Sequence, residues 1–220
     1  MIGALSKTRL AHVRWIAGGT GAGKSTLCRI LAQRYDLTVY IGDRAEHTWT
    51  PRFTKDQHPY AWATIHQTLE QRALCSPEQR FAEASSLHGE TIGFVLDDLL
   101  AMPDDRPILV DWFGNTPHDV VPLLSWPEQA VFLLPTPEFR RIALTERFAD
   151  SDRARATWGD TDHARALAIR LARDDLWDAE MRRQAVETGA QILLVDGSRS
   201  AEELADDVAE RFRLTTDQAR

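Results

Sequence analysis

The sequence is poor in cysteine, and it contains no long apolar run. Its two cysteines, Cys28 and Cys75, are far apart, which predicts neither a disulfide framework nor a cysteine-based zinc site. No apolar stretch approaches the roughly 18 residues that a membrane-spanning helix requires. Residues 1–10 include basic side chains but lack the apolar core of a signal peptide, so we expect a cytoplasmic protein.

Lysine is also scarce, in a chain that is acidic overall. The formal net charge of −7 argues against nonspecific binding to nucleic acid or to an anionic membrane. The chain has 220 residues, of which 43% are hydrophobic and 27% charged, so we expect a single globular domain over residues 1–220. Among the 26 basic residues only Lys7, Lys24 and Lys55 are lysines, which draws attention to the surroundings of Lys24.

A glycine-rich motif contains that lysine. Residues 18–25 read Gly-Gly-Thr-Gly-Ala-Gly-Lys-Ser and match the phosphate-binding pattern G-x-x-x-x-G-K-[ST] in full. Glycines let the backbone bend closely around an anion, so that its N–H groups surround the α and β phosphates of a nucleotide. The lysine reaches the β and γ phosphates, and the hydroxyl of Ser25 can bind Mg²⁺. The predicted nucleotide-binding residues of this segment are Gly18, Gly19, Thr20, Gly21, Ala22, Gly23, Lys24, Ser25 and Thr26.

The context of the motif favours this interpretation over a glycine-rich loop that binds nothing. An apolar strand is predicted over residues 13–17, and residues 25–34 have apolar side chains at helical spacing. A phosphate-binding loop of this type follows a strand and opens a helix.

Apolar runs and helical segments alternate along the rest of the chain. The strands we expect are residues 13–17, 37–41, 107–112, 130–134 and 191–195. The helices we expect are residues 25–34, 60–74, 77–86, 90–100, 116–124, 137–148, 163–188 and 201–212. This alternation predicts an α/β protein with a parallel sheet covered on both faces.

Aspartates follow three of these strands, at the edge where such sheets bind ligands. Asp111 ends the third strand and could hold Mg²⁺, although it could equally be a turn residue. Asp43 follows the second strand, where a carboxylate could orient an acceptor hydroxyl or take its proton; the alternative is again a turn. Asp196 follows the fifth strand.

On these features the chain resembles the nucleoside-monophosphate-kinase-like group of P-loop small-molecule kinases, which includes shikimate, chloramphenicol and thymidylate-type kinases. Besides the glycine-rich motif and Asp43, residues 131–141 and 194–204 carry the resemblance, which spans about residues 12–213. It implies a three-layer P-loop NTPase fold with five parallel strands in the order 2-3-1-4-5. It also implies a core of residues 12–43, 107–149 and 163–213, a helical acceptor-binding insertion over 44–105, and a lid at about 147–162.

The same resemblance implies roles for particular residues. Asp43 corresponds to the acceptor-binding or base aspartate, and Gly197 and Ser198 to the loop beside the adenine ring. Lid arginines stabilise charge on the transferring phosphoryl group, and we expect Arg147 first and Arg153 second to do so. The further lid candidates are Arg140, Arg141 and Arg155.

The insertion departs from the nucleotide kinases, because it lacks their arginine pattern for gripping an acceptor phosphate. Arg44 and Arg52 stand there among aromatic and histidine side chains, namely His47, Trp49, His58, Tyr60, Trp62 and His66. This mixture suits a sugar, a nucleoside or a natural product such as an antibiotic.

The leading hypothesis is therefore transfer of the γ-phosphoryl group from Mg–ATP, or from GTP, to a hydroxyl of a small molecule. Neither nucleic acid nor membrane is expected as a partner, and the oligomeric state is open. One alternative is a nucleotide switch, because residues 111–114 match D-x-x-G; however, no guanine-reading N-K-x-D motif follows the fourth strand. The other alternative is a regulator that binds ATP without transferring phosphate.

Overall fold

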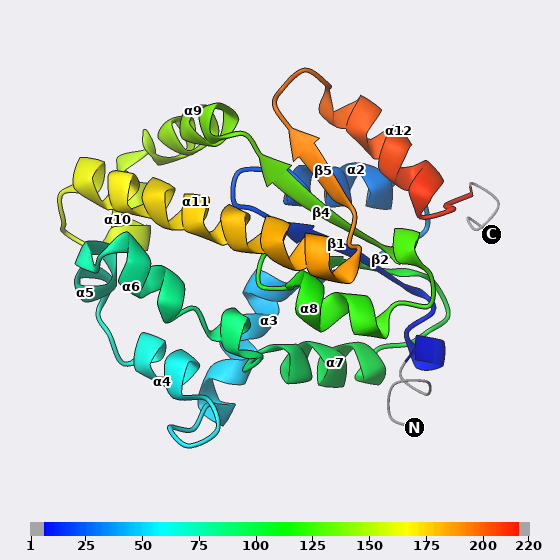
Figure 1. Cartoon of the computed structure of the whole chain (residues 1–220), viewed down its shortest axis with the longest axis horizontal. Helices are drawn as coiled ribbons and strands as arrows, with labels where there is room; N and C mark the ends of the chain where they lie inside the picture. Colours follow the sequence, from blue (N-terminus) through cyan, green and yellow to red (C-terminus); the bar gives the residue numbers. More distant parts are fainter. Residues whose placement is uncertain (1–6, 216–220) are drawn as a thin grey trace.

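A central parallel sheet organises the molecule (Figure 1), whose computed structural model describes residues 7–215. The strands are β1 (Val13–Gly18), β2 (Thr38–Ile41), β3 (Ile108–Asp111), β4 (Ala130–Pro135) and β5 (Ile192–Val195). All neighbouring strands are parallel, in the order β2-β3-β1-β4-β5. The α/β class, the five-stranded parallel sheet and the order 2-3-1-4-5 are thereby confirmed.

Helices cover both faces of the sheet, because the side chains of each strand alternate between two cores. In β1, Trp15 points into one core and Ile16 into the other. The helices α2 (Lys24–Arg34) and α12 (Ala201–Arg211) pack on the face of Ile16. The face of Trp15 is covered by α7 (Ile92–Ala101), α8 (Pro117–Val120) and α11 (His163–Thr188).

Short helices fill the chain between β2 and β3. They are α3 (Gly42–Trp49), α4 (Pro59–Ile65), α5 (Leu69–Leu74) and α6 (Pro77–Ala82), with single 3-10 turns at Thr50–Arg52 and Ser85–His88. The sequence predicted one helix over residues 60–74, but the structure divides it. Thr68 is the reason: its hydroxyl accepts a hydrogen bond from the N–H of Gln71, whose side chain accepts one from the N–H of Thr68. This capping box starts a new helix.

The second half of the chain contains one helix that the sequence did not indicate. Both α9 (Pro137–Phe148) and α11 occupy the predicted ranges, and Gly189 ends α11 in the left-handed conformation with φ 73°. Between them, the polar segment 150–162 forms α10 (Ser151–Trp158), capped by the carboxylate of Asp150. The remaining single turns are Val121–Leu123 and Pro127–Gln129. Within residues 7–215, no helix has both the length and the apolar character needed to cross a membrane.

A small separate core joins α10 to the helices between β2 and β3. Ala154 and Trp158 of α10 are buried against Ala73 of α5 and Ala166 of α11. The ring of Trp158 lies 4.3 Å from that of Phe148, between centroids. The polar segment 150–162 is thus anchored to the rest of the molecule by the buried side chain of Trp158.

We predict that Trp158→Ala lowers the free energy of unfolding by about 3–5 kcal/mol, because it leaves a cavity in this small core. Urea unfolding followed by circular dichroism measures the change. The matched control is Trp62→Ala, since Trp62 is only partly buried and stacks on His66 near the surface. Equal losses for the two variants would contradict the role assigned to Trp158.

Candidate functional site

The glycine-rich loop connects β1 to α2 at the carboxyl ends of the central strands. Gly18 is the last residue of β1, and α2 begins at Lys24, directly after Gly23 in the left-handed conformation. Within the described chain no side chain caps the start of α2. The first N–H groups of the helix therefore keep their capacity for an anion, which the positive end of the helix dipole also attracts.

Gly18 shows why the loop begins with glycine. Its φ is 110°, and a Cβ atom there would overlap the carbonyl oxygen of Leu133 in β4. The next N–H, that of Gly19, donates to the same carbonyl at 2.8 Å. The loop thus passes so close to β4 that no residue larger than glycine fits at position 18.

Lys24 folds back onto the loop that precedes it. Its Nζ donates to the carbonyl of Gly19 at 2.8 Å and to that of Gly18 at 3.2 Å. Burial lowers the pKa of Lys24, while the charges of Asp111 and Asp43 raise it again. The ammonium group is therefore held beside the loop by two backbone carbonyls.

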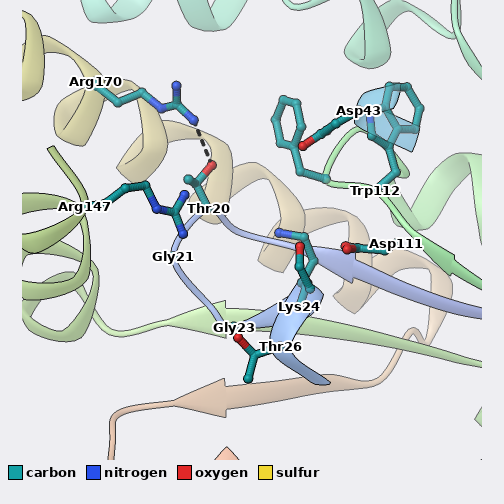
Figure 2. A pocket seen from close by; sticks show the side chains of 12 residues that line it. Thr20, Gly21, Gly23, Lys24, Thr26, Asp43, Asp111, Trp112, Arg147 and Arg170 are labelled. Atoms are coloured by element: carbon teal, nitrogen blue, oxygen red, sulfur yellow. Dashed lines mark hydrogen bonds between the residues drawn. The ribbon is translucent and has the colours of Figure 1, made fainter. Parts of the chain in front are cut away.

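A cavity of about 250 Å³ lies beside this loop (Figure 2). It is lined by Thr20, Gly21, Gly23, Lys24, Ser25, Thr26, Asp43, Asp111, Trp112, Phe113, Arg147 and Arg170. Figure 2 shows Arg147 and Arg170 on one side of the cavity and Asp43 with Trp112 on the other. Of the predicted loop residues, Gly18, Gly19 and Ala22 do not line it, and the Ala22 side chain packs into the core below.

Asp111 ends β3 next to the start of α2. The residue is 7% exposed. Burial raises the pKa of Asp111, against the opposing effects of a hydrogen bond with the Ser25 side chain and of the Lys24 charge. A carboxylate and a hydroxyl held together fit Mg²⁺, which usually takes one or two protein oxygens and completes its shell with phosphates and water. In the described chain, no three or more acidic, histidine or cysteine side chains cluster in a way that could hold a metal ion.

Asp43 reaches the cavity from a helix rather than from a turn. A turn at Gly42-Asp43 was the alternative that the sequence left open, but α3 begins at Gly42 directly after β2. The backbone of Gly42 contacts Trp112, and a Cβ atom on Gly42 would overlap the indole ring. This close packing fixes the first turn of α3 beside β3 and points the predicted residue Asp43 into the same cavity as Lys24 and Asp111.

The predicted lid arginines are separated by the structure. Arg147, on α9, lines the cavity, whereas Arg153, on α10, does not. Arg153 is still close enough to act on its neighbour: partial burial, the charge of Arg170 and then that of Arg153 lower the pKa of Arg147. Arg141 and Arg155 are exposed, and Arg155 pairs with Asp160 at 2.9 Å.

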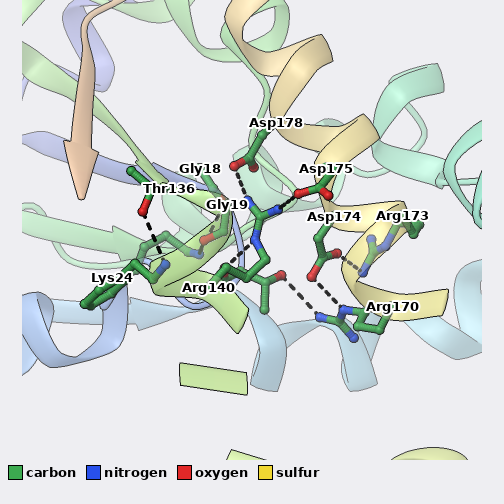
Figure 3. Close-up of polar contacts among 12 residues, drawn as sticks. Gly18, Gly19, Lys24, Thr136, Arg140, Arg170, Arg173, Asp174, Asp175 and Asp178 are labelled. Atoms are coloured by element: carbon green, nitrogen blue, oxygen red, sulfur yellow. Dashed lines mark hydrogen bonds and ion pairs between the residues drawn. The ribbon is translucent and has the colours of Figure 1, made fainter. Parts of the chain in front are cut away.

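Arg140 is buried under the loop instead of lying in the cavity (Figure 3). Its guanidinium forms ion pairs with Asp178 and, at 2.7 Å, with Asp175, both on α11. Its Nε donates to the carbonyl of Thr20 at 3.4 Å. Burial raises the pKa of Asp178 to about 6, although Arg140 opposes this shift. Arg140 therefore supports the loop from below rather than facing a ligand.

Arg170 was missed by the sequence analysis. Its Nη2 donates to the hydroxyl of Thr20 at 3.2 Å, and its Nε pairs with Asp174 at 2.9 Å. In the sequence, Arg170 and Asp174 look like an ordinary i,i+4 pair on a long helix. Only the placement of α11 against the loop makes them part of the site.

Gly197 and Ser198 do not line this cavity. They follow β5, where the N–H and hydroxyl of Ser198 both bond to the carboxylate of Asp196. Gly197 lies against the ring of Phe139 in α9. This turn is ordered by its own aspartate, so the aspartate after the fifth strand has a local structural role.

Models of protein families were searched and none matches the chain, and no curated protein matches it either.

We predict that Gly42→Ala lowers the free energy of unfolding by about 1–3 kcal/mol, because the added methyl group must displace Trp112. Chemical unfolding measures this. Gly93→Ala, on α7, is the control: a Cβ atom there meets open space, and stability should stay constant or rise by up to about 1 kcal/mol. The account of Gly42 fails if both variants behave alike.

Proposed function

We propose that this chain is a P-loop NTPase-type kinase that transfers the γ-phosphoryl group of ATP, or of GTP, to a hydroxyl of a small molecule. The observation that carries the proposal is that Lys24, Asp111 and Asp43 line one cavity at the carboxyl edge of a parallel sheet. That edge is where open α/β sheets bind their ligands.

The nucleotide side of the proposal rests on the loop and on α2. The loop N–H groups and the uncapped start of α2 would bind the α and β phosphates. Lys24, now bonded to the carbonyls of Gly18 and Gly19, would exchange these bonds for the β and γ phosphate oxygens. Ser25 and Asp111 would hold Mg²⁺, which offsets phosphate charge during transfer.

The acceptor side rests on Asp43 and on the arginines opposite. The acceptor oxygen forms a bond to the γ-phosphorus while the bond to the β–γ bridging oxygen breaks, and the nucleoside diphosphate leaves. Asp43 would accept the proton of the acceptor hydroxyl. Arg147 and Arg170, which line the opposite wall, would stabilise the charge on the phosphoryl group in transit.

The geometry favours this function over a nucleotide switch. A switch of the D-x-x-G type would need Gly114 close to the terminal phosphate. Gly114 is buried, lies against the ring of Trp112 and the hydroxyl of Ser86, and does not line the cavity. A regulator that binds nucleotide without transfer differs from a kinase only in turnover, so the experiments below measure binding and transfer separately.

We predict that Lys24→Ala weakens binding of Mg–AMP-PNP by about 10- to 100-fold, because a charged hydrogen bond contributes about 1.5–3 kcal/mol. Isothermal titration calorimetry measures the affinity. Lys55→Ala is the matched control: Lys55 lies near the ring of Trp62, outside the cavity, and its removal should leave the affinity unchanged. If wild type takes up no Mg–AMP-PNP, the proposal falls.

We predict that Asp43→Asn lowers acceptor-dependent release of ADP by about 10²- to 10⁴-fold, the range for loss of a general base. A coupled assay with ATP and a panel of hydroxyl compounds measures the release, and calorimetry should show unchanged affinity for AMP-PNP. Asp56→Asn, at an exposed position outside the cavity, should retain full activity. Full activity of Asp43→Asn would remove Asp43 from the mechanism, and absence of turnover with every acceptor would favour the regulator.

A further inference from the structure

A second cavity, of about 310 Å³, adjoins the first. The two cavities share Trp112, Phe113 and Arg170. The outer wall comes from the short helices between β2 and β3, through Arg72 of α5 and Arg80 of α6. The inner wall comes from α11, through Arg170 and Arg173. Four arginines that are distant in sequence therefore gather next to the cavity of the glycine-rich loop.

The positive charge of this cluster is not balanced by direct ion pairs. Arg170 and Arg173 share a single carboxylate, that of Asp174 (Figure 3). Neither Arg72 nor Arg80 forms an ion pair with any residue in 7–215. Two glutamates line the cavity, but Glu83 accepts a hydrogen bond from Gln79, and neither it nor Glu46 pairs with a basic side chain in the described chain.

Arg173 is the most deeply buried of the four arginines. Its side chain is 7% exposed, and its Nε has no hydrogen-bond partner within the part of the chain that the structure describes. Burial and then the charge of Arg170 lower the pKa of Arg173 to about 9. The pKa of Arg80 is likewise lowered, first by burial and then by the charges of Arg170 and Arg72. Charged groups that are buried and repel one another cost free energy unless an anion joins them.

The cavity also offers the neutral contacts that a small anionic molecule needs. Hydroxyl groups of Thr64, Ser85 and Ser86 line it, and the ring of Phe113 lies 5.7 Å from the guanidinium carbon of Arg173. Guanidinium groups bind carboxylate and phosphate through paired N–H donors. A hydroxyl compound held here by its anionic end lies next to the cavity that contains Asp43.

On this basis, and resting on the proposed function, we infer that the acceptor is an alcohol with a carboxylate or phosphate group, which Arg72, Arg80 and Arg173 bind. The composition of the insertion favoured a sugar, a nucleoside or a natural product, and the inference adds an anionic group to the acceptor. Arg52, one of the two arginines noted there, pairs with Asp97 at 3.0 Å and lies outside this cavity. The arginines that matter come from α5, α6 and α11.

Three compounds that share a carbon skeleton test this inference. The protein is first saturated with Mg–AMP-PNP, so that added anions cannot occupy the glycine-rich loop, and is then titrated with glycerol, glycerate and glycerol 3-phosphate. We expect glycerate or glycerol 3-phosphate to bind at least about tenfold more tightly than glycerol, since each supplies a charged partner to the arginines. The tighter of the two identifies the anionic group. Equal affinity for all three, or binding of none, overturns the inference.

Two variants locate the binding. Arg173→Gln and Arg80→Gln should each weaken binding of the preferred anion by at least about tenfold, with AMP-PNP affinity unchanged within about twofold. Arg106→Gln, whose side chain is 44% exposed and outside both cavities, should change neither. Unchanged anion affinity in Arg80→Gln overturns the assignment.

A measurement without ligand guards against misfolded variants. Arg80→Gln should raise the melting temperature of the ligand-free protein, because Arg80 is repelled by Arg170 and Arg72. A lower melting temperature would contradict the inference that the charge of Arg80 is uncompensated. Failure of wild type to bind AMP-PNP refutes the proposed function. Binding of AMP-PNP without any preference for the anions refutes only the inference about the acceptor.

Discussion

The buried guanidinium of Arg140 connects three elements around the site, namely α9, α11 and the glycine-rich loop. It is 1% exposed, and it joins α9, which carries it, to two carboxylates on α11 and to the backbone of the glycine-rich loop. Removing one partner from such a buried pair typically costs about 3–5 kcal/mol, because the other charge is left without compensation. Through this contact the sheet, the loop and α11 keep one relative position, and α11 in turn supplies Arg170 and Arg173 to the two cavities.

Charge is distributed unevenly over this acidic protein. The chain has a formal net charge of −7, yet its two adjacent cavities are rich in arginine. Some surface arginines have an acidic partner, as Arg52 and Arg155 do. Within the two cavities, Lys24 and the arginines supply positive charge, while Asp43 and Asp111 supply negative charge.

The sheet and the loop could be predicted from sequence because their signals are local. A buried parallel strand is a short apolar run, and the phosphate-binding motif needs only adjacent residues. The resemblance then supplied the strand order, which the structure confirms. Lys24, Asp43, Asp111 and Arg147 were predicted and line the first cavity, but the arginines that α11 supplies could not be predicted this way. Arg170 and Arg173 are two of many charged residues on a long helix, and only the rotation of α11 about its axis decides which of them face inward. Likewise, α10 depends on burial of Trp158 against Ala73, a contact between residues far apart in sequence.

The position of Arg170 between the two cavities has a thermodynamic consequence. Its guanidinium bonds to the hydroxyl of Thr20 on one side and to Asp174, the partner of Arg173, on the other. If both cavities bind ligands as proposed, occupancy of either would change the electrostatic surroundings that the other ligand meets. Thermodynamic linkage is reciprocal: if the first ligand changes the affinity for the second by some factor, the second changes the affinity for the first by the same factor. Under the proposed function, one side chain would therefore couple the two cavities, and neither dissociation constant would be a property of its own cavity alone.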